Sequence, residues 1–198
     1  FRRIKFMRKN VFTIIVTHNG ERWIKDTIQS LFKSIYSCSI VVVDNGSSDK
    51  TLKILSEFKE IKLIENQLNL GFGQANNIGI KYSQKKKADY IFLLNQDAKV
   101  ERDTISDLVN VLEKNKNFGI ISPLHYDGKG DKYDFNFRKY TDVNFGKKNL
   151  YETKFINAAA WMIKSDIFLK YGTFSKEFFH YGEAVSYTHL RAHETNSN

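Results

Sequence analysis

The sequence is poor in cysteine, in proline and in long hydrophobic runs, and each shortage excludes a class of protein. Cys38 is the single cysteine, so disulfide bonds within the chain are excluded and a reducing compartment is expected. We expect Cys38 to be a small buried core residue. No apolar run approaches the roughly 18 residues of a membrane-spanning helix, and we expect no signal peptide. The sequence therefore predicts a soluble, cytoplasmic protein.

The composition suits one globular domain with an excess of positive charge. Hydrophobic residues make up 41% of the 198-residue chain, which is enough for one core but not for two. The net charge of +9 favours an anionic partner such as a nucleic acid, an anionic membrane or a phosphorylated ligand. Five bases and no acid lie in the first nine residues: Arg2, Arg3, Lys5, Arg8 and Lys9. We expect the basic segment 1–10 either to contact the inner face of the cytoplasmic membrane or to be a disordered end.

Short β-branched runs alternate with segments of helical period, which is typical of an α/β protein. The runs predict strands at 11–17, 39–45, 61–66, 90–95 and 118–123. Two helical faces are predicted between them, namely Ile24, Ile28, Leu31 and Ile35, and Ile105, Leu108, Val109 and Leu112. A further helix, with N-cap candidates at Ser47 and Ser48, is predicted from Leu52, Leu55 and Phe58. This alternation predicts right-handed crossovers and a mostly parallel, Rossmann-like sheet.

The regular alternation stops near Pro123, the single proline. Residues 125–154 are polar and rich in aromatic residues and glycine, so we expect a long loop or an irregular hairpin. An apolar stretch returns at 155–168 and predicts a strand followed by a short helix. Trp161 and Met162 in this stretch are expected in the core.

Polar residues follow each of the first four predicted strands. Because the carboxyl ends of parallel strands meet at one edge of a sheet, we expect these residues to line one ligand-binding crevice. Asp44 is either an ordinary turn residue or an acceptor for a base N–H and ribose hydroxyls. Asp97 is placed to hold Mg²⁺ or Mn²⁺ together with diphosphate oxygens and water. The four ends carry Thr17, His18 and Asn19; Asp44, Asn45 and Gly46; Asn66; and Asn95, Gln96 and Asp97.

The stretch NLGFGQANN, residues 69–77, contains two glycines one residue apart and leads into a helical pattern. The spacing of Gly71 and Gly73 suggests a dinucleotide-binding fingerprint, but Asn76 stands at the third glycine position and the stretch follows the third strand instead of the first. A dehydrogenase is therefore disfavoured. The glycines still allow a close backbone approach, and the amides at the start of the helix favour an anion.

Five motifs occur in a fixed order: TIIVTHNG, VVVDNGSSDKT, NLGFGQANNIGI, FLLNQDAKV and FINAAAWMIKSDIFLKYGTFSKEFFHYGE. On these motifs the chain resembles glycosyltransferase family 2, whose members have the GT-A fold and use nucleotide-sugars. It is most similar to the bacterial subset that builds surface polysaccharides, including rhamnosyltransferase-like members. The resemblance covers residues 11–183.

The resemblance implies an enzyme that transfers a sugar, with inversion, in cell-surface polysaccharide synthesis. It implies a UDP- or dTDP-sugar as donor and a hydroxyl of a glycan or lipid-linked saccharide as acceptor. It also implies a divalent cofactor, Mg²⁺ or Mn²⁺, which would help the diphosphate to leave. The fold that it implies is the nucleotide-diphospho-sugar transferase fold, a mostly parallel central sheet flanked by helices.

The resemblance also implies roles for the matching residues. Asp97 closes Asn95-Gln96-Asp97, which stands where the family has its D-x-D-type motif, and it would bind the metal and the diphosphate. Since Asn95 replaces the first carboxylate, one anionic contact is lost and the metal dependence is relaxed. The implied nucleotide-sugar contacts are Thr17, Asn19 and Asp44 at the base and ribose, Asn69, Gly71, Gly73 and Asn77 in the wall around the donor, and Asn95 and Asp97 at the diphosphate.

Glu183 is implied as the general base, but the sequence departs from the family immediately after it. The family usually continues with an Asp, whereas here Ala184 follows and the pattern disappears. Either Glu183 acts alone or the base is missing. We therefore expect a basic segment at 1–10, a C-terminally incomplete catalytic domain at 11–183, and a disordered or non-native tail at 184–198.

Two other classes of function stay open. The break at Ala184 favours a non-catalytic or truncated fragment that binds nucleotide-sugars. The charge of +9 favours a nucleic-acid-binding protein, but its bases are scattered beyond the first nine residues and Lys85, Lys86 and Lys87, and no recognition module is present. We expect no nucleic-acid partner.

Overall fold

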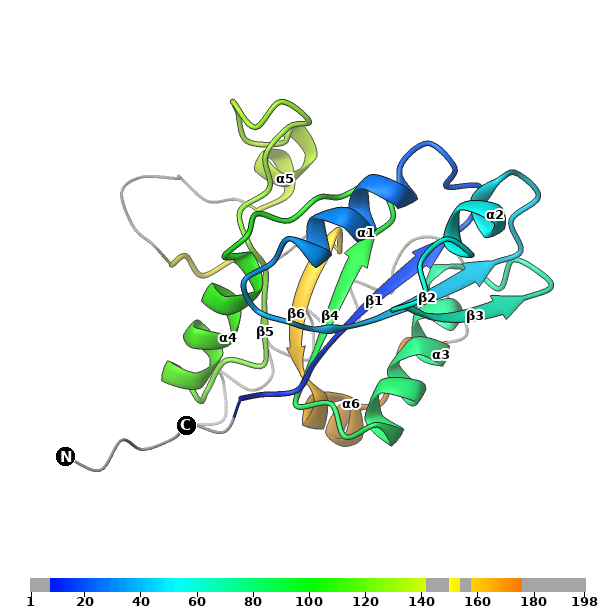
Figure 1. Ribbon diagram of the computed structural model, residues 1–198. Coiled ribbons are helices and arrows are strands. Elements are labelled where there is room, and N and C mark those ends of the chain that lie inside the picture. The colour runs from blue at the N-terminus through cyan, green and yellow to red at the C-terminus, as the bar shows by residue number, and fades with distance from the viewer. Residues whose placement is uncertain (1–7, 142–149, 154–157, 176–198) are drawn as a thin grey trace.

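The computed structural model describes residues 8–141, 150–153 and 158–175, which form a six-stranded sheet with helices on both faces (Figure 1). The strand order is β3-β2-β1-β4-β6-β5. The strands are β1 Val11–Thr17, β2 Ser39–Asn45, β3 Lys62–Asn66, β4 Tyr90–Asn95, β5 Ile120–Ile121 and β6 Ala160–Lys164. The predicted α/β architecture is confirmed.

The sheet is parallel on one side and antiparallel on the other. β3, β2, β1 and β4 run in the same direction, and β6 and β5 are added with antiparallel pairing. In Figure 1 the arrowheads of β1, β2 and β3 point toward the same side of the molecule. The prediction of a mostly parallel sheet is therefore correct for its first four strands.

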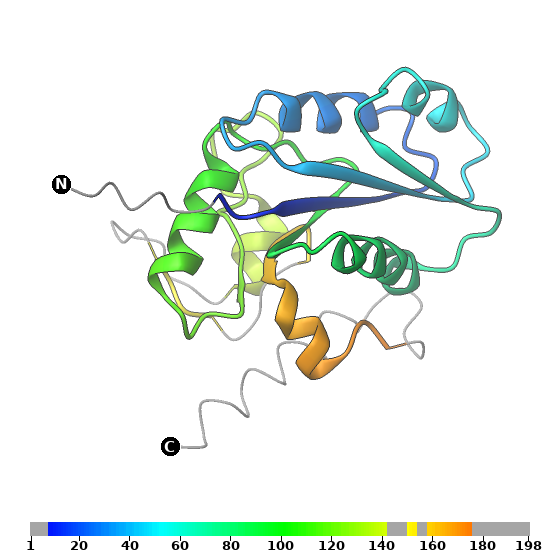
Figure 2. The ribbon, with the colours of Figure 1, turned by 60° about the horizontal axis from the view of Figure 1, so that its bottom comes forward.

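Helices cover both faces of the sheet, as Figure 2 shows with α1 and α2 above it and α3 and α6 below it. The helices are α1 Ile24–Phe32, α2 Thr51–Leu55, α3 Phe72–Lys85, α4 Thr104–Lys114, α5 Phe135–Tyr140 and α6 Ser165–Tyr171. The apolar side chains of α1, α2 and α4 pack in one core cluster, and those of α3 and α6 pack in the other. This division follows from the two-residue period of the strands, whose alternate side chains enter opposite clusters.

The central strands are buried on both faces, as their continuous apolar runs predict. Trp161 and Met162 lie in the core on opposite faces of β6, as expected. Cys38 packs against the cluster of α1, accepts a hydrogen bond from the Thr13 hydroxyl at 3.3 Å, and has its pKa raised by burial. Cys38 is thus partly buried at the edge of the core, so its predicted place in the core is only partly correct.

Helix α3 packs closely on the central strand. A Cβ atom added at Gly79 would lie 2.6 Å from Cγ2 of Ile14 on β1, which is shorter than real contacts allow. Only a glycine therefore lets the helix approach the sheet to this distance. This contact fixes the position of α3, whose first residues reach the carboxyl edge of the sheet.

Several predicted boundaries are wrong. The side chain of Ile35 is 61% exposed because α1 ends at Phe32, one turn earlier than the periodicity predicts. Helix α2 begins after Lys50 without a side-chain cap, so Ser47 and Ser48 are not its N-cap. The predicted fifth strand shrinks to two residues that pair only with β6. A short helix, α5, lies inside the region predicted to be a loop or hairpin, with Asp134 as its cap through a 2.8 Å bond from the Phe137 amide.

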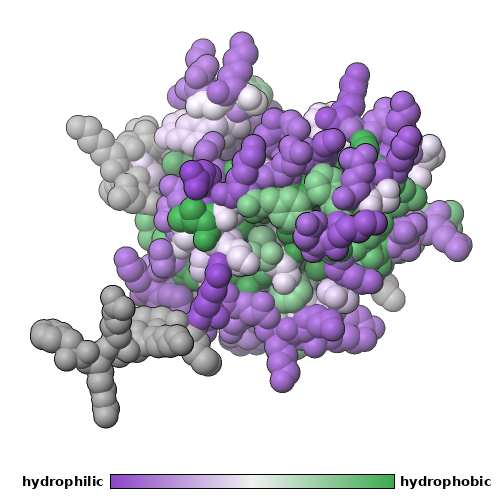
Figure 3. Space-filling model, viewed as in Figure 1, coloured by the Kyte–Doolittle hydropathy of each residue, from purple (hydrophilic) through white to green (hydrophobic). Residues whose placement is uncertain are grey.

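The surface of the described region is mostly hydrophilic. On the face shown in Figure 3, hydrophobic side chains gather toward the middle, and hydrophilic ones surround them. None of the helices among residues 8–141, 150–153 and 158–175 has the length and hydrophobicity of a membrane-spanning segment.

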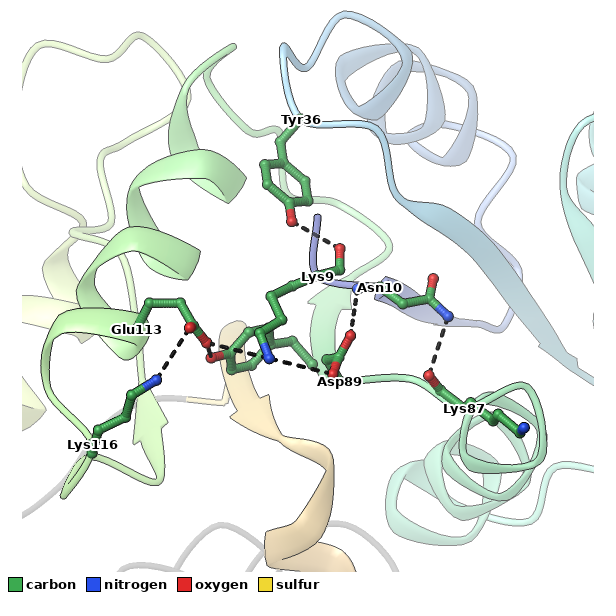
Figure 4. A network of polar contacts seen from close by, with 8 residues as sticks. Lys9, Asn10, Tyr36, Lys87, Asp89, Glu113 and Lys116 are labelled. Atoms are coloured by element: carbon green, nitrogen blue, oxygen red, sulfur yellow. Dashed lines mark hydrogen bonds and ion pairs between the residues drawn. The ribbon is translucent and has the colours of Figure 1, made fainter. Parts of the chain in front are cut away.

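A network of hydrogen bonds and ion pairs lies at the amino edge of the sheet, opposite the predicted crevice (Figure 4). Asp89 accepts a 2.7 Å hydrogen bond from the Asn10 amide, and the ammonium of Lys9 lies 3.6 Å from the same carboxylate and 3.9 Å from that of Glu113. The Tyr90 hydroxyl donates to Glu113, and this bond holds the pKa of the Glu113 carboxyl below its usual value. The network ties the start of β1 to β4 and α4.

Candidate functional site

The carboxyl ends of β2, β1 and β4 lie side by side, as the strand pairing requires. Thr17 on β1 is opposite Asp44 on β2, and Val16 on β1 is opposite Asn95 on β4. Since neighbouring strands are about 4.8 Å apart, the ends of β2 and β4 are separated by roughly 10 Å. The structure therefore brings Asp44 and the loop of Asp97 to the same edge of the sheet, as predicted.

Asp44 is buried, and only one of its two carboxylate oxygens is bonded within the described part of the chain. Its side chain is 1% exposed. Oδ2 accepts a 3.1 Å hydrogen bond from the Ser47 amide, whereas Oδ1 is enclosed without a donor. An unpaired buried carboxylate oxygen is costly, so such an atom is typical of a site that a ligand donor completes.

Asn19 joins the loop after β1 to the loop after β2. It adopts a positive φ of 50°, its amide N–H donates to the Ser47 hydroxyl at 2.9 Å, and its Oδ1 accepts from the Ser48 amide at 2.8 Å. These bonds fix the side-chain oxygen, while its Nδ2 stays at the exposed edge beside His18, 3.5 Å from that ring's Nε2. The predicted contact residue is thus also a structural link between two loops.

Asn45 is the centre of the neighbouring turn, and it was predicted to line the crevice but not to contact the donor. Its Nδ2 donates to Asn69 Oδ1 at 2.8 Å, and its Oδ1 accepts from the Leu70 amide at 3.0 Å. Asn69 Oδ1 also accepts a 2.9 Å bond from the Gly71 amide, and Gly71 has a positive φ of 80°. The signal that could have identified Asn45 is its place directly after Asp44, where its side chain must point to the opposite face.

The start of α3 carries the predicted wall residues. Gly71 precedes the helix and Gly73 lies in its first turn, and both are buried. The Asn77 side chain donates to the Phe174 carbonyl at 2.8 Å and accepts from the Phe174 amide at 3.0 Å. Asn77 therefore shapes this wall by fastening the segment after α6 to α3.

Gln96, which lies between Asn95 and Asp97, was also predicted to line the crevice but not to contact the donor. Its Oε1 accepts from the Thr17 hydroxyl at 2.6 Å and from the His18 amide at 3.1 Å. Its backbone carbonyl accepts from the Thr27 hydroxyl at 2.7 Å. Gln96 therefore holds the loop of Asp97 against the end of β1 and the start of α1.

Asp97 lies at the exposed carboxyl edge, and no hydrogen bond or ion pair of its carboxylate is found in the described region. Asn95, two residues earlier, ends β4 and donates its backbone amide to the Ala159 carbonyl at 2.9 Å. Among the described residues, no cluster of three or more His, Cys, Asp or Glu side chains is placed to hold a metal ion. A metal at Asp97 would need ligand oxygens and water to complete its shell. Glu183, the predicted base, lies outside the described residues.

Comparison with models of known families identifies the family of the chain. The model of the family "Glycosyl transferase family 2" matches residues 13–172. The chain belongs to glycosyltransferase family 2. The match contains β2 to β6, the last five residues of β1 and every predicted site residue except Glu183.

Curated members of this family are similar over most of the chain. The dTDP-rhamnosyl transferase RfbF of Shigella flexneri is 30% identical over 174 residues, which are 87% of this chain and 56% of that protein. The rhamnosyltransferase WbbL of Escherichia coli is 28% identical over 134 residues, 66% of this chain and 50% of that protein. The chain thus spans about half the length of these relatives.

Solved structures show the same fold at lower identity. The mannosyltransferase PcManGT of Pyrobaculum calidifontis, in complex with GDP-Man and Mn²⁺, has a TM-score of 0.72 and 19% identity, and the match covers 94% of this chain and 52% of that one. TarS of S. aureus in complex with UDP has a TM-score of 0.70 and 18% identity, with coverage of 90% and 54%. The predicted GT-A fold of this glycosyltransferase family 2 chain is therefore confirmed.

Proposed function

We propose that the chain is the catalytic part of a glycosyltransferase that moves a sugar from a UDP- or dTDP-sugar to a hydroxyl of a glycan or lipid-linked saccharide. Membership of glycosyltransferase family 2 supports the class of reaction. The single observation that supports the site is Asp44 Oδ1, a buried acceptor without an internal donor at the carboxyl edge of the sheet. The likeness to rhamnosyltransferases supports a role in surface polysaccharide synthesis.

In this proposal the nucleoside binds at the ends of β1 and β2. Asp44 Oδ1 accepts a hydrogen bond from a base N–H or a ribose hydroxyl, which supplies its missing donor. Thr17 and Asn19 stand beside it on the same edge. Asn69, Gly71 and Gly73 form the wall, with Asn77 holding the Phe174 segment behind it.

Asp97 is the proposed ligand of Mg²⁺ or Mn²⁺, with Asn95 beside it. An exposed carboxylate with no hydrogen bond or ion pair to the described residues suits such an ion, because Mg²⁺ is usually held by one or two protein carboxylates together with phosphate oxygens and water. When bound, the ion would neutralise charge that develops on the departing diphosphate. The structure of PcManGT with GDP-Man and Mn²⁺ supports the use of a divalent ion.

Glu183 is the proposed base for an inverting reaction. The acceptor oxygen attacks the anomeric carbon, the bond from that carbon to the diphosphate oxygen breaks, and the carboxylate takes the hydroxyl proton as the new bond forms. The alternative is a fragment that binds the donor but transfers nothing, which the unusual Ala184 after Glu183 favours. Turnover of a UDP- or dTDP-sugar with a lipid-linked acceptor separates the two.

Thermal unfolding with nucleoside diphosphates tests the proposed site. We expect UDP or dTDP with Mn²⁺ to raise the Tm of the wild type by about 5 °C or more at saturating ligand. Asp97→Ala is expected to lose the part of the shift that depends on Mn²⁺, whereas the exposed loop variant Asp131→Ala is expected to keep it. The absence of a shift with every nucleotide tested would contradict the proposal.

A further inference from the structure

The side-chain amide of Gln96 connects two parts of the proposed donor site. Its Oε1 accepts from the Thr17 hydroxyl at 2.6 Å and from the His18 amide at 3.1 Å, and its Nε2 donates to the His18 carbonyl at 3.3 Å. One side chain therefore satisfies three polar groups of the turn that follows β1. An apolar side chain of the same length would satisfy none of them.

The backbone at Gly20 passes very close to the side-chain amide of Gln96. A Cβ atom added at Gly20 would lie 2.4 Å from Gln96 Oε1 and 2.5 Å from Thr17 Oγ1. The glycine thus allows the turn to close over the hydrogen bond between Thr17 and Gln96. Because Gly20 is buried and its amide donates to the Thr51 hydroxyl at 2.8 Å, this turn is held in place from the other side.

The hydroxyl of Thr17 has one proton, and the direction of its hydrogen bond matters for Asp44. Thr17 and Asp44 are opposite each other in the pairing of β1 with β2. They also lie on the same face of the sheet, since Ile15 and Val42, two residues earlier on each strand, pack in the same core cluster. The backbones of neighbouring strands are about 5 Å apart, so a rotation of the Thr17 side chain about χ1 would turn its hydroxyl toward the Asp44 carboxylate.

We propose that Gln96 is a positioning residue for donor binding, because it draws the Thr17 proton away from Asp44 and so keeps Asp44 Oδ1 free for the nucleotide. The proposal rests on the proposed function. Without the Gln96 acceptor, the Thr17 hydroxyl turns to Asp44 Oδ1, which has no donor among the described residues, and the nucleotide must then break that bond. Gln96 acts through Thr17 and Asp44 and has no part in the transfer itself.

Isothermal titration of UDP and of dTDP in the presence of Mn²⁺ tests the proposal on the wild type and four variants. Gln96→Met is expected to bind about tenfold more weakly than the wild type. The Asp44 carboxylate then accepts from Thr17, so the ligand no longer gains a hydrogen bond to this charged group. Thr17→Val is expected to weaken binding by only about threefold. The double variant Thr17→Val, Gln96→Met is expected to bind like Thr17→Val, and therefore more tightly than Gln96→Met alone. The matched control is Gln29→Met at an exposed position of α1, which is expected to bind like the wild type.

The recovery in the double variant separates positioning from simple structural support, since a loosened or unfolded turn is not repaired by a second substitution. The inference is wrong if the double variant binds no better than Gln96→Met, or if Gln96→Met binds like the wild type. If the wild type itself binds neither nucleotide, the proposed function fails instead.

Discussion

At the scale of single residues, His125 links stability to pH. Burial lowers its pKa from 6.5 to about 4, opposed in part by the nearby Asp134 carboxylate. Its Nε2 lies 3.0 Å from the Ser122 hydroxyl, and its ring stacks on Phe137 with centroids 4.3 Å apart. A folded-state pKa below the unfolded value means that the neutral ring contributes stability above pH 6.5 and loses it as the pH falls toward 4.

We expect His125→Gln to flatten this dependence. Between pH 7 and about pH 4, the wild type should lose on the order of 2–3 kcal/mol more free energy of unfolding than the variant. Denaturant unfolding at several pH values measures the difference. The exposed control His18→Gln should follow the wild type, and equal slopes for His125→Gln and the wild type would refute the prediction.

Some residues of the candidate site could be recognised from their position at the end of a strand. Others could be recognised only from their hydrogen bonds in the folded structure. The positions of Asp44 and Asp97 at the carboxyl edge could be predicted because Asp44 is the penultimate residue of the apolar strand β2 and Asp97 lies two residues after the end of β4. Asn45 and Gln96 could not be predicted as the residues that join the loops. Their partners, Asn69 and Thr17, are 24 and 79 residues away in sequence, and only the strand order makes them neighbours.

At the scale of elements, the close packing of α3 on β1 predicts a specific sensitivity to added volume. Gly79→Ala would place its Cβ 2.6 Å from Ile14, which is fully buried. Alanine in a helix is favoured over glycine by about 1 kcal/mol, but overpacking costs about 1–3 kcal/mol, so we expect a net loss of about 1–2 kcal/mol.

Thermal and denaturant unfolding measure this loss. The control is Gly128→Ala in an exposed turn, where an added Cβ meets nothing within 4 Å, and its stability should be unchanged. A Gly79→Ala protein as stable as the wild type would show that α3 can move away from the sheet without cost.

The elements that could be predicted from the sequence are those with a strong local pattern. β1, β2 and β4 are long apolar runs, and every predicted apolar position of α4 is buried. β5 could not be predicted as a two-residue strand, because its length is set by pairing with β6 about 40 residues later. Helix α5 was missed since its residues FNFRKY have no helical apolar face, and it depends on the Asp134 cap and the burial of Phe137.

At the scale of the whole molecule, the charge of +9 predicts an interaction with anionic lipid. Lys85, Lys86 and Lys87 are exposed at the amino edge of the sheet, on the same side as Arg8 and Lys9, and the Asn10 side chain donates to the carbonyls of Lys86 and Lys87 (Figure 4). This arrangement places several cations at the end of the molecule opposite the candidate site. A membrane bound there would leave the carboxyl edge open.

Co-sedimentation with vesicles measures this interaction. We expect binding to phosphatidylcholine vesicles only when phosphatidylglycerol is added, and a loss of that binding at high salt. The double variant Lys85→Gln, Lys86→Gln should bind roughly 30-fold more weakly, because each lysine near the surface contributes about 1 kcal/mol. Lys50→Gln, Lys53→Gln, at the start of α2, serves as the control with the same change of charge. Equal binding by both double variants would exclude the amino edge as the contact.

Because β4 lies between β1 and β6, the sheet can be completed only after residues 160–164 have been synthesised. β4 pairs with β1 on one side, and on the other side with β6, whose Ile163 is opposite Ile91 although 72 residues separate them. During synthesis, a nascent chain that has released β1 to β4 but not residues 160–164 exposes a bare, strongly apolar strand edge to the cell. A chaperone that shields such edges would therefore be needed most during this interval, and ribosome stalling within it would favour aggregation.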